Sequence, residues 1–413
     1  MNYLSLTKSS LFLYLATTFC AYAQTPPEKS NSLITPVVNQ YHKLAQQGVH
    51  LHLSYTFETG GNLSGGTDHG YGYNDQTSLG MMLNLQKLLG LKGGQFHMVL
   101  TNRGGQADNI NKKAHLGDQM QSLEVHGLGR TTRLSQFYYE QRLLNERLDF
   151  KLGRMPFGTE FGKADCNFTY FGLCGSQIGK YNGTIYGPTI SQWSGNVTYH
   201  FLPSWAVKAG VYQNNASWLK NSQGLNFGNP KGIHGVTLPV ELHWSPTIGL
   251  LHGLYKLGYW WDTTGGTDIA TGQKHSHKHG LYFNASQQLM RLKNNPQRML
   301  KLFVISTLND PKFNDVERSI ATGLTLIGPF ASRVHDKFSI GVDYMHMSSH
   351  YAQSEKTANE AVSSDEVVFA SYYRMQLGKH LELGPELQYI DHPGGTSHNA
   401  NSWIATFKGT ISF

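Results

Sequence analysis

The last eleven residues of the chain, Trp403-Ile-Ala-Thr-Phe-Lys-Gly-Thr-Ile-Ser-Phe413, carry the pattern that decides the fold. From Trp403 onward, apolar or small residues occupy every second position, and mostly polar residues stand between them. Because successive side chains of a strand point to opposite faces, the stretch predicts a strand with one apolar and one polar face. A tilted strand of about 9–11 residues spans a bilayer, and aromatic residues at both ends fit the interfacial girdles of a membrane barrel. The alternative is an amphipathic edge strand of a soluble protein.

The same alternation recurs along the whole chain. Between Val49 and Glu58, for example, every odd-numbered residue is apolar and every even-numbered residue is polar. About sixteen such segments are present, and no long helix is expected after about residue 47. The segments begin near residues 48, 73, 94, 132, 147, 191, 204, 235, 252, 279, 299, 318, 336, 365, 380 and 402. We therefore predict an all-β fold, a transmembrane antiparallel β-barrel of about 16 strands.

Composition agrees with a barrel and argues against other classes of protein. The 413 residues include 45 Gly, 22 Tyr and 20 Phe but only 14 Pro, which favours one large β structure with many turns. Mean hydropathy is negative, but the strands of a membrane barrel are apolar only at every second residue, so a hydropathy profile underrates them. The net charge of +7 comes from scattered residues without a basic run, so no nucleic-acid partner is expected.

The connections between the segments alternate between long and short. Residues 59–72, 104–131 and 156–190 form long connections, whereas residues 90–93 and 145–146 form short ones. Outer-membrane barrels have this asymmetry, with tight periplasmic turns and long extracellular loops. The connection 156–190 is then the third and longest extracellular loop.

The N-terminus has the features of a secretory signal. Residues 1–23 contain Lys8, an apolar run over residues 11–19 and an Ala21-Tyr-Ala23 ending that suits signal peptidase. The run is shorter than the roughly 20 apolar residues of a membrane-spanning anchor, which is the alternative. We predict a cleaved signal peptide at 1–23, a short periplasmic segment at 24–47 and the barrel at 48–413.

Two cysteines, Cys166 and Cys174, remain after removal of the predicted signal. In an oxidising compartment a pair so close in sequence normally forms a disulfide, and two free thiols are the alternative. Closing so short a loop restrains the unfolded chain by about 2–3 kcal/mol, which matters little for global folding of a chain of this length. The bond is therefore expected to fix the shape of one loop.

Three groups of short motifs follow one another from about residue 134 to the C-terminus. The first group is Gly153-Arg-Met155, Glu160-Phe161, Cys166, Phe168 and Cys174-Gly175. The others are Leu238-Pro-Val-Glu-Leu-His-Trp244 and Pro385-Glu-Leu-Gln-Tyr-Ile-Asp-His-Pro-Gly-Gly395. Together they resemble the OprB family of carbohydrate-selective porins. The segment before residue 48 and the connection 104–131 contribute nothing to this resemblance.

The resemblance implies a location and a function. It implies a porin of the Gram-negative outer membrane, surrounded by lipid and lipopolysaccharide, through which carbohydrates such as glucose and other small polar solutes diffuse. In sixteen-stranded porins the third loop typically folds inward and narrows the channel, so a disulfide in residues 156–190 would hold the calibre of the pore. General porins are often trimers, whereas the OprB family suggests a monomer, and both states stay open here.

The parity of the strand residues assigns a lumen side without any alignment. The basic residues on this side are Arg103, Arg142, Lys151, Lys208, Lys256, Lys337, Arg374 and Lys408. The acidic residues are Glu58, Glu140, Asp149, Glu241, Asp262, Asp343, Glu382 and Glu386. Because a pore selects ions with a ring of one sign, this mixed lining fits neutral polar solutes, with a general or weakly anion-preferring porin as the alternative.

Within this lining we expect a constriction that binds the solute. A bulge at Gly153 would turn Arg154 into the lumen beside Glu160 and Glu140, and snorkelling of Arg154 to the membrane interface is the alternative. Three lumen aromatics are candidates for stacking on sugar rings, with barrel filling as the alternative: Tyr138, Tyr212 and Trp260. The predicted site residues are Arg154, Glu160, Glu140, Arg142, Tyr138, Trp260 and Lys151.

Other classes of site receive little support. His275, His277 and His279 share one side of an extended segment, which is a feasible spacing for a metal. Two lysines among them and the absence of an adjacent carboxylate or cysteine favour a solvated loop, so neither a metal nor a cofactor is predicted. No Gly-x-Ser-x-Gly motif indicates a hydrolase, and the chain before residue 48 is too short for the plug of a gated transporter. An adhesin or an enzyme barrel is the remaining alternative.

Overall fold

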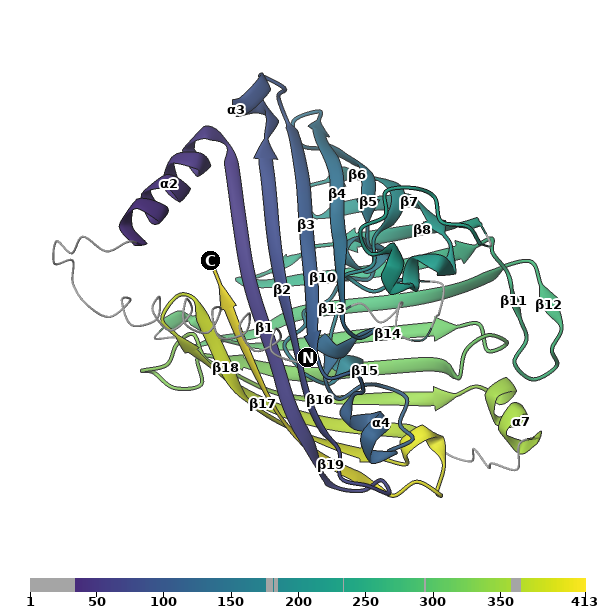
Figure 1. Cartoon of the computed structure of the whole chain (residues 1–413). Helices are drawn as coiled ribbons and strands as arrows, with labels where there is room; N and C mark the ends of the chain where they lie inside the picture. The colour runs from purple at the N-terminus through teal and green to yellow at the C-terminus, as the bar shows by residue number, and fades with distance from the viewer. Residues whose placement is uncertain (1–33, 176–180, 182–184, 233, 293–294, 358–364) are drawn as a thin grey trace, which may run out of the picture.

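The computed structural model describes residues 34–413, except residues 176–180, 182–184, 233, 293–294 and 358–364. The predicted signal peptide at 1–23 lies outside the described residues. The first described element is helix α2 (Ile34–Gln47), which leads into the first strand (Figure 1). Among the described helices, none combines the length and the apolar character that crossing a bilayer requires.

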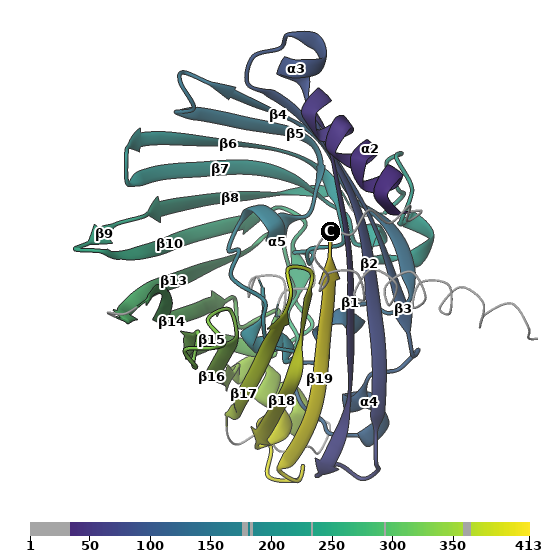
Figure 2. The same ribbon diagram turned by 90° about the vertical axis from the view of Figure 1, so that its left-hand side faces the viewer.

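Sixteen long strands and the two-residue strand β9 (Thr247–Ile248) form one antiparallel sheet that closes on itself (Figures 1 and 2). The long strands are β1 (Val49–Ser64), β2 (Tyr71–Asn84), β3 (Gly94–Gly105), β4 (Thr131–Leu143), β5 (Leu148–Met155), β6 (Gln192–Leu202), β7 (Trp205–Asn214), β8 (Gly235–Trp244), β10 (Leu251–Asp262), β13 (Lys278–Leu292), β14 (Asn295–Asn309), β15 (Val316–Ile327), β16 (Lys337–Met347), β17 (Glu366–Leu377), β18 (Leu381–Asp391) and β19 (Ser402–Ser412). The barrel closes where β1 pairs with β19, with Ser54 opposite Ser412 and Ser64 opposite Trp403. Closure pairs the backbone of every strand on both sides, which a sheet surrounded by lipid requires.

The predicted strands are all present, so the predicted fold class is confirmed. The largest difference between predicted and observed starts is at β14, which begins at Asn295 instead of near residue 299. The remaining elements lie in the connections. They are α3 (Leu85–Leu89), α4 (Ile110–Ala114), η1 (Glu124–His126), α5 (Phe157–Glu160), η2 (Phe171–Leu173), η3 (Ala216–Leu219), η4 (Asn221–Gln223), β11 (Gly266–Thr267), β12 (Lys274–His275), α7 (Ser349–Thr357) and η5 (Pro393–Gly395).

Short and long connections occupy opposite ends of the barrel, as predicted. We call the end where β1 begins and β19 finishes the turn side, and the opposite end the loop side. The β2–β3 turn holds the single helical turn α3, because the side chain of Asn84 caps its first residues and Gly90 takes up φ 75° at its C-terminus. The two longest loops, residues 106–130 (the second loop) and 156–191 (the third loop), start from the loop side.

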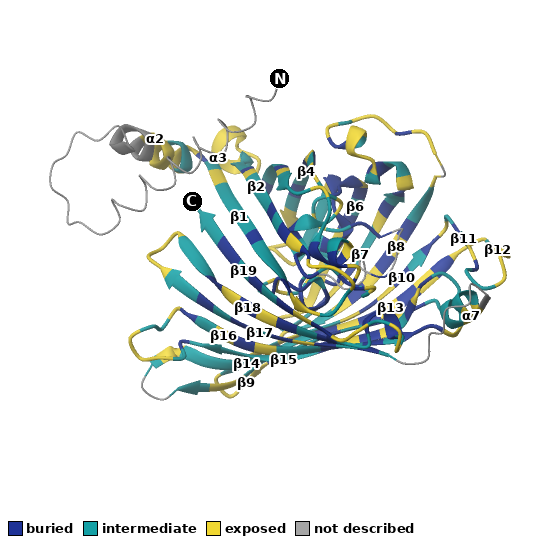
Figure 3. Cartoon of the chain, turned by 60° about the horizontal axis from the view of Figure 1, so that its bottom comes forward, coloured by how far each residue is buried: buried dark blue, intermediate teal, exposed yellow. Residues whose placement is uncertain are grey.

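Buried and more exposed residues alternate along the strands (Figure 3). Along β17, Val368, Ala370 and Tyr372 are buried inside the barrel, whereas Phe369 between them is 52% exposed on the outer wall. The same holds for β19, where Trp403 is exposed and Ile404 is buried. An apolar outer wall is what a lipid environment stabilises, and a polar lumen is what a water-filled pore requires.

Both long loops fold into the barrel. Figure 2 shows α5 of the third loop inside the ring of strands. Apolar side chains of the two loops join those of the lumen wall in one buried cluster, which includes Leu116, Leu123, Phe168, Leu173, Ile305, Val368 and Ile390. The inward third loop confirms the prediction, and the inward second loop adds a layer that no motif indicated.

Candidate functional site

A buried ion pair fastens the third loop to the wall formed by β17 and β18. Glu386 Oε2 accepts a hydrogen bond from the backbone amide of Thr169 at 2.7 Å, and Glu386 Oε1 accepts one from that of Tyr170 at 3.1 Å. Arg374 Nη2 lies 2.9 Å from Glu386 Oε2 and donates to the carbonyl oxygen of Asn167 at 3.2 Å. The two charged side chains are fully buried. Since each charge is paired and hydrogen-bonded, burial of the pair fixes the loop in one position.

A second set of bonds fastens the start of the third loop to β8, β10 and β13. Glu241 accepts hydrogen bonds from the backbone amide of Gly162 and from the Tyr282 hydroxyl, both at 2.7 Å. Asn284 donates to the carbonyl oxygen of Gly162 at 2.6 Å, and Lys256 Nζ donates to that of Lys163 at 2.8 Å. The third loop therefore crosses the lumen from one wall to the other.

The second loop is tied to the same structure. Its Glu124 lies 3.0 Å from Lys408 Nζ, and Lys408 Nζ lies 3.0 Å from Glu58 of β1. The backbone amide of Glu124 donates to the carbonyl oxygen of Thr169 at 2.9 Å, and the amide of Phe171 donates to the second loop in return. The two loops and the wall are thus one hydrogen-bonded unit.

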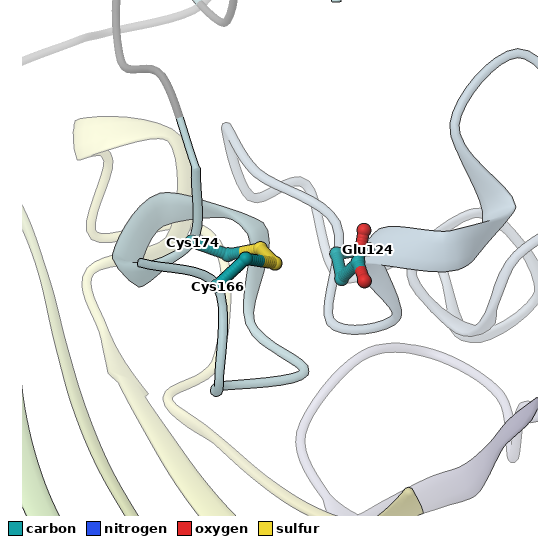
Figure 4. A group of neighbouring side chains, drawn as sticks. All are labelled: Glu124, Cys166 and Cys174. Carbon is teal, nitrogen blue, oxygen red and sulfur yellow. A yellow bond between two sulfur atoms is a disulfide. The ribbon is translucent and has the colours of Figure 1, made fainter. Parts of the chain in front are cut away.

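The predicted disulfide Cys166–Cys174 is present, and it encloses the residues that fasten the third loop to β17, β18 and the second loop. Segment 167–173 between the cysteines supplies the backbone groups that bond to β17, β18 and the second loop. Figure 4 shows the two sulfur atoms pointing towards Glu124. These three residues form the only group of possible metal ligands found among the described residues. Because the sulfurs are bonded to each other, neither offers a thiolate, and the group is not a metal site.

Charged side chains of both signs line the opposite part of the lumen. Glu160 of α5 lies 3.1 Å from Lys151 Nζ of β5 and forms a closer ion pair with Lys208 of β7. Burial alone would raise the pKa of Glu160, but Lys208 and Lys151 outweigh it and hold that pKa below its ordinary value. Glu160 is therefore an anion at neutral pH.

A row of side chains on β3 and β4 continues this lining. Arg142 donates to Glu140 at 2.8 Å and keeps 41% of its side chain exposed. His97 Nε2 lies 3.4 Å from Glu140, and the His97 ring stacks on Tyr138 with 4.6 Å between ring centroids. Of the predicted site residues, Glu140, Arg142, Tyr138, Lys151 and Glu160 are thus brought together. His97 was missed, although the parity of strand 94–105 places it on the lumen side.

Arg154 lies elsewhere, and the predicted bulge at Gly153 is wrong. Strand β5 pairs with β4 and β6 without a register shift, and Arg154 stands opposite Phe137 and Trp193 on the outer wall. The loop after β7 folds over that wall and covers the arginine. Its guanidinium group lies 4.5 Å from the ring of Trp218 and donates to backbone carbonyl oxygens of Ser191 and Asn226.

This cover explains how an arginine can stand on the outer wall. A charge at a lipid-facing position is costly, and the folded loop supplies carbonyl groups and an aromatic face that replace water. Neither a bulge nor snorkelling is needed. Arg154 consequently lines no part of the pore.

The two other predicted stacking residues are inside the barrel but inaccessible. Trp260 and Tyr212 are fully buried in a cluster with Phe157 and Phe161 of the third loop. They fill the barrel, which was the alternative interpretation. The parity assignment itself holds for the lumen charges that contact the two loops, and these are Glu58, Lys208, Glu241, Lys256, Lys337, Arg374, Glu386 and Lys408.

His275 of β12, His277 in the loop that follows it and His279 of β13 do not converge on one point. His277 stacks on Trp261 with 4.2 Å between ring centroids, and His279 Nδ1 lies 3.8 Å from Asp310. His275 instead contacts the ring of Phe313. The predicted solvated loop holds for the exposed His277, whereas His279 lies on strand β13.

Comparison with known proteins agrees with this geometry. Porin B of Pseudomonas aeruginosa is 32% identical over 402 residues, which is 89% of this chain and 88% of that protein. A structure of Pseudomonas putida OprB at high pH superposes with a TM-score of 0.86 at 30% identity and covers 91% of this chain and 97% of that one. An OmpF structure from Salmonella typhi, at 8% identity and a TM-score of 0.55, shares the fold and covers 89% of this chain and 99% of that one.

The family model for carbohydrate-selective porins matches residues 68–413, which is most of the chain and nearly all of the barrel. The members are channels of the Gram-negative outer membrane, so the loop side of the barrel is extracellular and the turn side is periplasmic. The chain is a channel and not an enzyme. It belongs to the OprB family of carbohydrate-selective porins.

Proposed function

We propose that monosaccharides, glucose among them, cross the outer membrane through a passage between the third loop and strands β3 to β5. The observation that carries the proposal is a row of paired charges of both signs, in which Arg142 is exposed, Lys151 is partly exposed and the two carboxylates are nearly buried. Glu140 pairs with Arg142, and Glu160 pairs with Lys151. Paired charges offer hydrogen-bond donors and acceptors to hydroxyl groups without a net field that would select an ion.

Each site residue has a distinct role in this passage. Arg142 and Lys151 donate hydrogen bonds to sugar hydroxyls, and the nearly buried Glu140 and Glu160 hold these two cations in position. Because His97 covers Tyr138, the imidazole ring is the aromatic face that meets the solute. Sugar rings present C–H groups on one face, and an aromatic ring packs against that face while polar neighbours bind the edge.

The proposal also covers the N-terminal segments, the surrounding membrane and the oligomeric state. Residues 1–23 direct export and are removed, and residues 24–47 remain in the periplasm. The exposed apolar outer wall contacts lipid and lipopolysaccharide. A single chain closes its own pore, so a monomer suffices for transport, and a homotrimer would add no strand to the lumen.

The test is the single-channel conductance of the purified protein in a planar bilayer, with sugars titrated in. Discrete openings that glucose blocks in a saturable manner support the proposal. Openings that chloride carries in preference to potassium, without block by sugars, would instead support the alternative of a weakly anion-preferring general porin. Absence of any pore would refute both.

A further inference from the structure

We infer that the periplasmic vestibule contains a second binding site for a neutral monosaccharide, separate from the constriction. The inference rests on the proposed function and extends it to the place where the solute leaves the pore. A cavity of about 410 Å³ lies between the inward loops and the periplasmic end of β17, β18 and β19. Binding sites for small molecules occupy clefts of about 300–1,000 Å³, so the volume suits one sugar with its hydration water.

The cavity lies on the periplasmic side of the inward loops. Glu124 of the second loop and Asn167 of the third loop form its inner wall. Gln376 at the end of β17, Lys379 in the turn that follows it and Ser412 at the end of β19 form its outer wall. A sugar that has passed the third loop therefore meets this cavity before it reaches the periplasm.

The lining suits a polyhydroxylated solute. Thr56, Thr410 and Ser412 contribute hydroxyl groups, and Gln76 and Asn167 contribute amides. Hydroxyl and amide groups both donate and accept hydrogen bonds, so they can match sugar hydroxyls in either role. Asn167 belongs to the third loop and the other four residues to adjacent strands, so one ring can bond to the loop and to the wall.

The charges of the lining compensate one another. Lys408 lies 3.0 Å from Glu124, and Glu382 accepts a hydrogen bond from Lys337 at 2.7 Å. Lys379 is the remaining cation of the lining. Because the carboxylates are already paired, the cavity presents no field that would favour a cationic solute, and one free lysine is too little to build an anion site. A neutral sugar fits this balance better than a sugar acid or an amino sugar.

Three lining groups keep unused hydrogen-bonding capacity. The side-chain nitrogen of Gln376 donates a hydrogen bond to the carbonyl oxygen of Gly378 at 3.1 Å, so its side-chain oxygen is left as an acceptor. Asn167 accepts a long bond of 3.4 Å from Lys337, which leaves its amide hydrogens as donors. Within the described part of the chain, Lys379 Nζ makes no hydrogen bond or ion pair. All three groups border the same cavity.

Protection of an introduced cysteine tests the site directly. With Cys166 and Cys174 bonded to each other and the predicted signal removed, a cysteine in place of Gln376 is the single free thiol of the protein. The matched control is Gln288→Cys, which makes the same change near the periplasmic end of β13, outside the cavity. A small charged thiol reagent is added to the full-length mature protein in detergent, and mass spectrometry follows the rate of modification.

We expect D-glucose to slow modification of the Gln376→Cys variant in a saturable manner. At a concentration about tenfold above its dissociation constant, bound glucose would leave about one site in ten free, so the rate would fall about tenfold. The Gln288→Cys control should change by less than about twofold under the same conditions. Gluconate, which carries a carboxylate, should protect neither position.

Two outcomes would overturn the inference. Equal rates for Gln376→Cys with and without glucose would do so, as would protection by gluconate as strong as that by glucose. Thr410→Cys provides a second position in the cavity if the first variant does not fold. Block of the wild-type current by glucose tests the proposed function separately. If glucose blocks the current but does not protect residue 376, only the second site is refuted.

Discussion

Lys408 and Glu124 are 284 positions apart in the chain, yet Lys408 Nζ lies 3.0 Å from a carboxylate oxygen of Glu124. The same ammonium lies 3.0 Å from Glu58, so one lysine of the last strand joins the first strand to the second loop. Glu58 and Lys408 are both buried. The final strand therefore does more than close the barrel, because its lysine also positions a loop inside the lumen.

Replacing Lys408 with methionine should destabilise the barrel. The change leaves the buried Glu58 without its counter-ion, and loss of one partner of a buried ion pair costs about 3–5 kcal/mol. The thermal unfolding midpoint in detergent should fall, as measured by circular dichroism. Lys92→Met in the exposed β2–β3 turn is the control and should unfold as the wild type does. An unchanged midpoint for Lys408→Met would show that the ion pair contributes nothing to stability.

Replacing Glu386 with glutamine should loosen the third loop. The substitution keeps the shape of the side chain but leaves Arg374 as an uncompensated buried charge, again at a cost of about 3–5 kcal/mol. A loop that moves should raise the current noise of single channels. The control is Glu382→Gln, which removes a carboxylate from a partly exposed pair with Lys337. Its single-channel current should be less noisy than that of Glu386→Gln. If both variants are equally noisy, the buried clamp is not what holds the loop.

Replacing Cys166 and Cys174 together with serine should change the channel more than the stability. The entropic contribution of so short a loop is about 2–3 kcal/mol, which is small for a closed barrel. However, the bond encloses the backbone groups that meet the wall, so its loss should add partial closures to single-channel traces. Wild-type protein treated with a reductant should behave in the same way. Traces identical to those of the oxidised protein would refute a role for the bond in pore calibre.

Replacing Lys151 with glutamate should shift the pore towards cations. The new carboxylate would stand next to Glu160 in place of the lysine that now lies 3.1 Å from it, so one wall of the passage would become acidic. The reversal potential in a salt gradient measures this shift, and sugar block should weaken at the same time. Lys92→Glu makes the same change of charge at the periplasmic rim and should move the reversal potential less.

The second loop should loosen as pH rises. Burial raises the pKa of Asp118 to about 7, and a hydrogen bond from Asn111 opposes this only in part. The folded protein therefore holds this proton at pH values where the unfolded chain has released it. The resulting stabilisation is complete below the unfolded pKa of about 4 and is lost as pH rises through about 7.

Hydrogen exchange of residues 106–130 measures this loosening, and protection should decrease between pH 5 and pH 8 after correction for intrinsic exchange rates. Asp118→Asn imitates the protonated acid and should abolish the decrease. A pH dependence that survives in this variant would assign the effect to other groups.

The strands and the two faces of the barrel could be predicted because each is a local property. In segments such as 49–58 and 403–413, the alternation of apolar and polar residues shows which side of each strand meets lipid and which meets water. The length of each connection indicates the side of the membrane on which that connection lies. The site was predicted in part. Parity and one motif predict that four charged residues line the lumen: Glu140, Arg142, Lys151 and Glu160. Neither of them predicts whether a solute can reach Trp260.

What only the tertiary structure decided is how the two long loops occupy the lumen. The expected bulge at Gly153 would have turned Arg154 into the lumen, but the fold keeps Arg154 on the outer wall, where the loop after β7 covers it. Likewise, lumen charges such as Glu386 and Lys408 were visible in the sequence, while their use as loop anchors depends on partners more than 200 positions away. By itself the sequence determined the barrel, because strand burial repeats every two residues. It left the pore undetermined, since contacts between distant loops and walls follow no period.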